Sequence, residues 1–148
     1  MLDIENILAQ WDKDSVIDSL ELDSASINSA KLHAKYLEMI SITRLEIKRN
    51  ENKLNTLLKN KYLWYNGKLN KEEMDNLGWS YDPLDGLKIM KGDMDLFYNS
   101  DSDIMTAKSK IDYLKNTEHT LKEILDNIRW RAQNIKNIIT WRQFTSGS

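Results

Sequence analysis

Apolar residues recur at helical spacing along two long stretches of the chain. Along residues 104–142, twelve positions separated by alternate steps of three and four carry ten apolar side chains. A heptad pattern of this length predicts a helix over about residues 102–143 with a coiled-coil-like seam. Ile124, Ile138 and Trp141 lie beside the seam, so the apolar face is wider than one partner helix needs. We therefore expect self-association.

A second long helix is predicted over about residues 22–66. This stretch is rich in good helix formers and contains neither glycine nor proline. Ile40, Ile47 and Leu54 mark its seven-residue spacing, and Gly67 is suited to end it in the left-handed conformation.

Shorter elements are expected around these two helices. Residues 2–11 are amphipathic, and residues 70–78 begin with a capping asparagine and end with a glycine. The segment 87–98 alternates loosely and predicts a small β element, and "SDSD" at 100–103 offers helix caps. The predicted fold class is therefore mainly α.

Composition is that of a globular protein that needs neither a membrane nor disulfides. The 148 residues are 41% hydrophobic and 30% charged, without cysteine. No run approaches the roughly 18 apolar residues of a membrane span, and the acidic N-terminal stretch is unlike a signal peptide. We expect no membrane association and a cytoplasmic location.

The net charge of −2 conceals segregated blocks of charge. Residues 1–23 carry seven acids and one base, residues 31–68 nine bases and three acids, and residues 69–103 nine acids and three bases. Residues 128–148 carry four bases and no acid. Basic blocks suit phosphate, and acidic blocks suit basic partners or the chain's own basic segments.

Motifs for catalysis, metal binding or cofactor binding are not found. The glycines are isolated and form no phosphate-binding loop. His33 and His119 have no potential ligand at metal-binding spacing, and the Asp pairs lack the pattern of a calcium loop. We predict no catalytic residue, no metal and no cofactor, and we expect a protein that is not an enzyme.

The stretch "LLKNKYLWYNGKL" at residues 57–69 combines lysines with aromatic rings. Cations that follow phosphates and rings that stack on bases are what a single-strand binder needs. On a helix, Lys61, Trp64, Tyr65 and Lys68 would share one face. The same rings could instead brace a core edge or a subunit interface. A similar run at 129–143 favours an interface, because its isoleucines need burial.

Three stretches, "DSVIDSLEL" at 14–22, "LKNKYLWYNG" at 58–67 and residues 94–147, together carry a resemblance to a known family. They resemble the UvsY family of recombination mediators from T-even-type phages. "DSVIDSLEL" at 14–22 is similar to the family's D-x-x-I-D-S-x-x-L segment, and "LKNKYLWYNG" at 58–67 to its L-K-x-[KR]-x-x-[WY]-Y-x-G segment. Residues 94–147 are similar to the C-terminal helix and its R-x-F ending. Residues 68–93 depart from the family pattern.

The resemblance implies a non-enzymatic mediator that acts as a homo-oligomeric ring, with six or seven subunits. Such a protein binds single-stranded DNA, loosens the single-strand-binding protein on it and helps load a RecA-like recombinase, here in the cytoplasm of an infected bacterial cell. The resemblance places the family's basic DNA-binding pair on Lys59 and Lys61. The length of 148 residues predicts one domain over residues 1–148, in which we expect a DNA-binding part (1–67), a connector (68–101) and an oligomerisation helix (102–145). The acidic blocks are candidate docking surfaces for partners.

Two sets of residues carry these predictions. The predicted nucleic-acid-binding residues are Arg49, Lys53, Lys59, Lys61, Trp64, Tyr65 and Lys68. The predicted oligomerisation residues are Ile111, Leu114, Leu121, Leu125, Ile128, Ile135 and Ile139. The alternative hypothesis is a non-enzymatic coiled-coil adaptor that binds only proteins.

Overall fold

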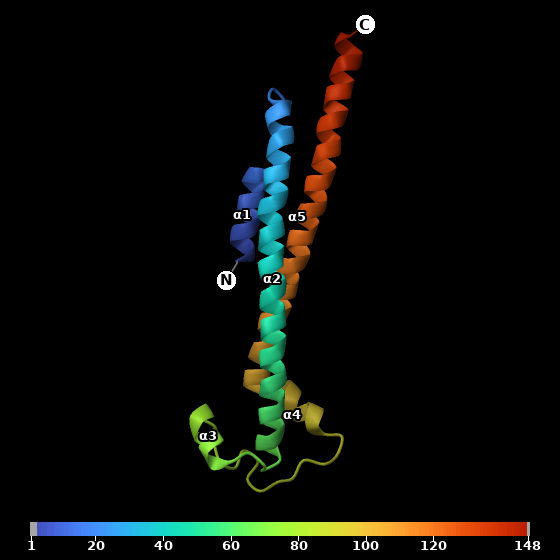
Figure 1. The fold of residues 1–148 in the computed structure, drawn as a ribbon. Coiled ribbons are helices and arrows are strands. Elements are labelled where there is room, and N and C mark those ends of the chain that lie inside the picture. The colour runs from blue at the N-terminus through green and yellow to red at the C-terminus, as the bar shows by residue number, and fades with distance from the viewer. Residues whose placement is uncertain (1–2, 148) are drawn as a thin grey trace. The chain divides into compact units, whose positions relative to one another are not determined.

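The fold is helical, and both predicted long helices are present. The computed structural model describes residues 3–147, which contain five helices and no strand (Figure 1). These helices are α1 (Ile4–Asp14), α2 (Leu22–Tyr65), α3 (Lys71–Leu77), α4 (Met94–Ser100) and α5 (Ser102–Ser146). None of the helices among these residues has the length and apolarity needed to cross a membrane.

The prediction of a β element near residues 87–98 is wrong. Residues 94–100 form α4, and residues 87–93 form a loop with a turn. A strand needs a hydrogen-bonded neighbour, and residues 3–147 provide no strand for pairing. The helical conformation satisfies the backbone locally and turns Tyr98 toward α2, where its hydroxyl donates to the carbonyl of Leu58 at 3.4 Å.

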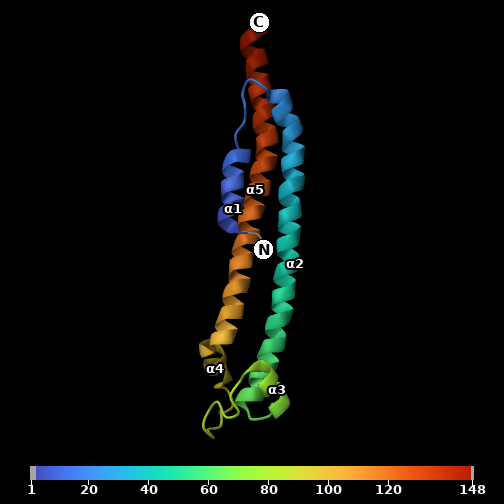
Figure 2. The same ribbon diagram turned by 90° about the vertical axis from the view of Figure 1, so that its left-hand side faces the viewer.

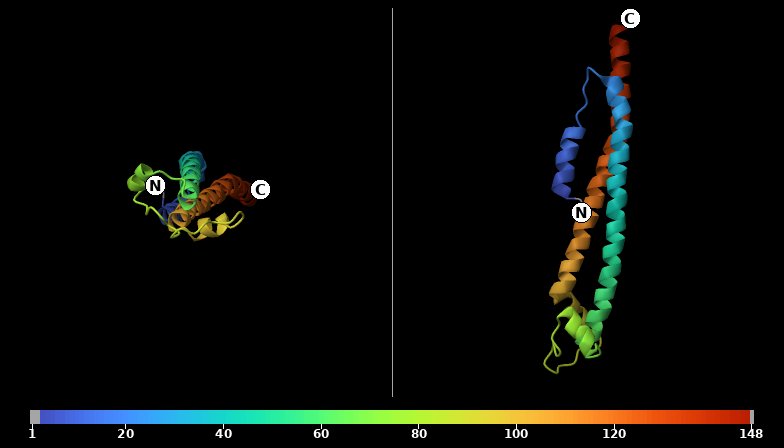
Figure 3. Two further views of the ribbon diagram at one scale, coloured as in Figure 1. Left: turned by 90° about the horizontal axis from the view of Figure 1, so that it is seen from below. Right: turned by 60° about the vertical axis from the view of Figure 1, so that its left-hand side comes forward.

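The chain divides into two compact units, and both long helices contribute to each. Unit 1 comprises residues 1–46 and 114–148, and unit 2 comprises residues 47–113. In unit 1, α1 lies alongside α2 and α5, and α2 and α5 run antiparallel (Figures 2 and 3).

An apolar cluster formed by all three helices holds unit 1 together. Ile7, Tyr36 and Leu121 are completely buried, one from each helix. The ring of Trp11 meets that of Tyr36 edge to face, with centroids 5.5 Å apart. The full cluster is Ile7, Leu32, Tyr36, Ile40, Leu121, Ile124, Leu125 and Ile128.

Polar contacts attach the end of α1 to the other two helices. The carboxylate of Asp14 accepts hydrogen bonds from Lys35 Nζ at 2.6 Å and from the Tyr36 hydroxyl at 2.9 Å. Burial raises the pKa of Asp14, but these two hydrogen bonds and the nearby positive charges outweigh it, so the pKa lies below its ordinary value. The guanidinium of Arg131 donates to the carbonyls of Asp14, Ser15 and Val16 at 2.9–3.1 Å. Arg131 therefore stabilises the fold from within the second basic run.

The apolar seam of α5 is buried against its own chain. Six of the seven side chains predicted for oligomerisation lie in the subunit core, and only Ile139 is exposed, at 39%. The buried six are Ile111, Leu114, Leu121, Leu125, Ile128 and Ile135. The large apolar side chains that α5 exposes toward its C-terminal end are instead Trp130, Trp141 and Phe144, at 67%, 65% and 77%.

Truncation of Leu121 tests the core of unit 1. Leu121→Ala removes a completely buried side chain and is expected to lower the free energy of unfolding by about 2–5 kcal/mol. Leu20→Ala is the matched control, because Leu20 is 87% exposed and its loss is expected to change stability by less than about 0.5 kcal/mol. Urea denaturation measures both, and equal effects would contradict the assigned core.

Candidate nucleic-acid interface

The end of α2 is a glycine-terminated turn that follows directly from the sequence. Gly67 adopts φ 69°, and the N–H of Lys68 donates to the carbonyl of Leu63 at 2.7 Å. This is the hydrogen bond of a Schellman motif, which a residue with a side chain at the left-handed position would strain. Lys68 therefore lies beyond the helix and does not continue the face of Lys61, contrary to the helical prediction.

The short helix α3 returns the chain toward the end of α2. The side chain of Asn70 caps α3 by accepting from the N–H of Glu73 at 2.8 Å, as predicted. Gly78 ends the helix at φ 71°, and the N–H of Trp79 donates to the carbonyl of Met74 at 2.9 Å. This second turn brings the ring of Trp79 to 5.0 Å from the ring of Trp64.

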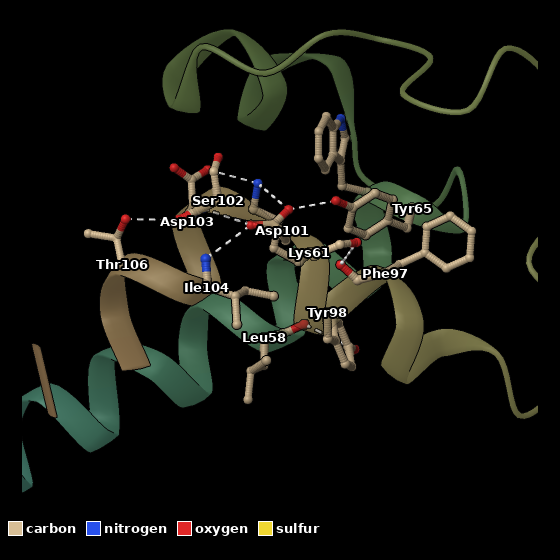
Figure 4. Close-up of polar contacts among 12 residues, drawn as sticks. Leu58, Lys61, Tyr65, Phe97, Tyr98, Asp101, Ser102, Asp103, Ile104 and Thr106 are labelled. Carbon is tan, nitrogen blue, oxygen red and sulfur yellow. Dashed lines mark hydrogen bonds and ion pairs between the residues drawn. The ribbon is translucent and has the colours of Figure 1, made fainter. Parts of the chain in front are cut away.

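The Lys61 side chain lies inside unit 2 and is ion-paired. Its side chain is 3% exposed, with Nζ 3.0 Å from Asp101 and 2.8 Å from Asp103 (Figure 4). The ammonium also lies over the rings of Trp64 and Trp79, at 4.4 and 4.1 Å from their centroids. These distances are typical of cation–π contacts. We call Lys61, Trp64, Trp79, Asp101 and Asp103 the Lys61 cluster.

Asp101 links the start of α5 to the end of α2. One carboxylate oxygen caps α5 by accepting from the N–H groups of Asp103 and Ile104, both at 3.0 Å. The other accepts from Lys61 and from the Tyr65 hydroxyl, the latter at 2.6 Å (Figure 4). Burial raises the pKa of Asp101, but the hydrogen bonds from Tyr65, Ile104 and Lys61 outweigh it, so the pKa is lowered. Burial and the bond to Asp101 raise the pKa of Tyr65.

The rings of Trp64 and Tyr65 are in contact with the protein itself. Trp64 packs on Tyr65 and Trp79, and its indole N–H donates to the carbonyl of Ser80 at 2.6 Å. Tyr65 packs on Phe97 of α4 with centroids 5.7 Å apart. Both rings therefore brace the end of α2, which is one of the two roles that the sequence allowed for the aromatic residues of 57–69.

The opposite face of α2 carries an exposed polar stripe. Five exposed residues recur along this face at steps of four, three, four and three. They are Lys48, Asn52, Asn55, Lys59 and Tyr62. We call them the α2 stripe. Within residues 3–147, neither Lys48 nor Lys59 has an ion-pair partner. Tyr62 is 43% exposed, and Lys68 approaches its ring at 5.9 Å, so Lys68 joins the end of the stripe.

The remaining predicted residues flank this stripe. Arg49 directly follows Lys48 in the sequence, and Lys53 directly follows Asn52. Both line a shallow hollow of about 370 Å³ with Asn52 and Thr56. Lys68 also lines a cavity of about 340 Å³ between the end of α2 and residues 81–89. The structure thus leaves Arg49, Lys53, Lys59 and Lys68 exposed, whereas Lys61 is buried in unit 2 and Trp64 and Tyr65 are half-buried there.

Several residues of this surface were absent from the sequence-based set. Lys48, Asn52, Asn55 and Tyr62 could have been found from their helical spacing, which places them on the face of Lys59. The role of Asp101 as the partner of Lys61 had no signal in the local sequence. In the described part of the chain, no group of three or more His, Asp or Glu side chains is arranged to hold a metal ion.

Comparisons with known proteins agree on one family and one fold. The family model described as "Recombination, repair and ssDNA binding protein UvsY" matches residues 10–148. Two crystal structures of the bacteriophage T4 recombination mediator protein UvsY superpose with TM-scores of 0.85 and 0.83, at 23% and 24% identity. They cover 99% and 97% of this chain and 99% of each T4 chain. A search of curated proteins gave no match.

The pH dependence of stability tests the environment of Asp101. Because its pKa is lowered in the folded state, ionised Asp101 stabilises the fold above about pH 4, and this contribution is lost as the pH falls further. Asp101→Asn is therefore expected to cost about 2 kcal/mol at pH 7 and progressively less below pH 4.

Urea titrations between pH 3 and 7 measure this difference. Asp112→Asn, at an exposed position of α5, is the control. A stability difference between wild type and Asp101→Asn that stays constant over the whole range would contradict the assignment.

Proposed function

Because the chain belongs to the UvsY family of recombination, repair and single-stranded DNA binding proteins, we propose that it is a recombination mediator whose α2 stripe binds single-stranded DNA. The observation that carries this assignment is that Lys48, Lys59 and Lys68 are exposed along the stripe and at its end, where Lys68 lies 5.9 Å from the exposed ring of Tyr62. None of the three lysines has an ion-pair partner among residues 3–147.

The stripe has the chemistry of a sequence-tolerant binder. Unpaired lysines can release counterions from phosphates, and an exposed tyrosine can stack on any base. Asn52 and Asn55 lie between the lysines and can donate hydrogen bonds to phosphate or sugar oxygens. Arg49 and Lys53 extend the positive charge along α2. The strand would therefore follow the axis of this helix.

The mediator role adds protein partners to the DNA. The T4 protein with this fold is a recombination mediator, and we extend that role to this chain. A strand held on the stripe would lose contacts with its single-strand-binding protein and become accessible to a RecA-like recombinase. This would take place in the cytoplasm of an infected bacterium. The acidic segments 1–23 and 69–103 are the surfaces we propose for protein partners.

Self-association would multiply weak strand contacts. We propose that the exposed rings near the end of α5, Trp130, Trp141 and Phe144, contact neighbouring subunits in place of the buried seam. The rings of Trp141 and Phe144 stack on each other with centroids 5.9 Å apart, which gives a preformed apolar surface. In a ring of subunits, one strand could engage several stripes in turn, and avidity would raise the affinity.

Replacement of Lys59 tests the DNA-binding face. Wild type is expected to bind single strands without strong sequence preference and to bind less tightly as salt rises. Lys59→Ala should weaken binding several-fold and lower the slope of log K against log salt by about 0.7 per lost phosphate contact. Fluorescence anisotropy with a labelled oligonucleotide measures both quantities.

The control is Lys122→Ala, which removes an exposed lysine of α5 that lies in unit 1. It should leave the salt slope unchanged. Equal slopes for wild type and Lys59→Ala would show that the stripe is not the binding face. Complete absence of binding would instead favour a protein-only adaptor.

The oligomer surface is tested at the end of α5. The double variant Trp141→Ala/Phe144→Ala removes the stacked pair and should lower the mean mass in solution, because the subunits lose apolar contact area. Light scattering provides the measurement, with Leu87→Ala as a control at a 75% exposed position of unit 2. An unchanged mass for the double variant would place the interface elsewhere.

A further inference from the structure

Lys59 and Lys61 belong to one basic motif but lie in opposite environments. Residues i and i+2 of an α-helix are about 200° apart around its axis, so Lys59 and Lys61 point to nearly opposite faces. Lys59 is exposed and has no ion-pair partner among residues 3–147. Lys61 is 2% exposed and contacts two carboxylates and two indole rings. One motif therefore supplies two lysines with different surroundings.

We infer that Lys61 is a positioning residue that shapes the end of the α2 stripe from within unit 2 and does not contact the DNA strand. The inference deepens the proposed function and rests on it only where DNA binding is measured. It differs from what the resemblance implies for Lys61, and it separates the basic pair into one contact and one internal support.

The ammonium of Lys61 has no capacity left for a phosphate. It carries three N–H donors, two of which reach Asp101 and Asp103 at 3.0 and 2.8 Å. The indoles of Trp64 and Trp79 cover it at 4.4 and 4.1 Å. A phosphate would have to displace Asp101, whose side chain is 4% exposed and is also held by Tyr65, or Asp103, whose side chain is 53% exposed. Displacing Asp101 would leave a buried carboxylate without its cation. Displacing Asp103 would place the negative charge of the phosphate beside that of Asp101.

The Lys61 cluster joins three segments that are distant in sequence. Lys61 comes from α2 and Asp101 caps α5 (Figure 4). Trp79 follows α3. Tyr62 is the next residue along α2, and Lys68 follows the turn between the helix and α3. By holding the segment after α3 and the start of α5 against the last turns of α2, Lys61 sets where Tyr62 and Lys68 lie. Its effect on DNA binding would therefore be indirect.

Two substitutions, made singly and together, test whether Lys61 supports the fold or contacts DNA. Lys61→Met removes the charge but keeps an unbranched side chain whose sulfur suits a site between aromatic rings. Asp101→Asn removes the counter-charge, and asparagine remains a good helix cap. The double variant Lys61→Met/Asp101→Asn therefore lacks both charges and leaves no buried ion unpaired at these two positions. The experiment uses full-length wild type, both single variants, the double variant and Lys59→Ala.

Thermal unfolding reports the role of Lys61 in the fold. Lys61→Met alone should lower the melting temperature by roughly 10 °C, because Asp101 stays buried without its cation. The double variant should recover at least half of that loss, so the two penalties are not additive. Lys59→Ala should melt like wild type. An unchanged melting temperature for Lys61→Met, or strictly additive penalties, would overturn the inference.

Binding to a labelled single strand, measured at 15 °C over a range of salt, reports contact with DNA. The double variant is expected to keep the wild-type salt slope, whereas Lys59→Ala loses about 0.7. A loss of the same size in the double variant would overturn the inference and make Lys61 a DNA contact. If wild type binds no single strand, the proposed function fails, and the melting series still decides whether Lys61 holds the cluster together.

Discussion

Burial of the apolar seam of α5 is the constraint on which the rest of the structure depends. A helix of this length with an apolar stripe must cover that stripe, and here its own chain does so. In unit 1 the cover comes from α1 and α2 around Tyr36 and Ile40. In unit 2, Ile104 and Ile111 of α5 are buried, as is Ile47 of α2. Once the seam is used inside the subunit, any contact between subunits has to use other surfaces.

Antiparallel packing of the two long helices also determines which cations remain available. At the end of α2, the residue that faces the start of α5 is Lys61, and a buried ammonium requires a counter-charge. Asp101 provides this charge while it caps α5. Arg131 is used in a comparable way in unit 1, where it satisfies three backbone carbonyls near the end of α1. Lys61 and Arg131 thus take part in contacts within the fold, whereas Lys48 and Lys59 on the opposite face of α2 are exposed and have no ion-pair partner among residues 3–147.

Much of the fold could be predicted because its signals are local. Helix periodicity, the caps at Asn70 and Asp101 and the turns at Gly67 and Gly78 all depend on residues within one or two turns of each other. The β element near residues 87–98 was predicted wrongly because a short alternating run does not distinguish a strand from a helix. In the structure, contacts of α4 with Leu58 and Tyr65 accompany the helical form.

The candidate site likewise has features that local sequence predicts and features that it does not. Sequence alone determined that residues 48–68 are basic, aromatic and mostly helical, and that the turn at Gly67 stops the helix. Only the tertiary structure decided that Lys59 and Tyr62 are exposed and that Lys61, Trp64 and Tyr65 face inward. The physical reason is that the element packed against a helix decides which of its faces is buried. The element that contacts Tyr65 through Asp101 lies 36 residues further along the chain, beyond the reach of any local pattern.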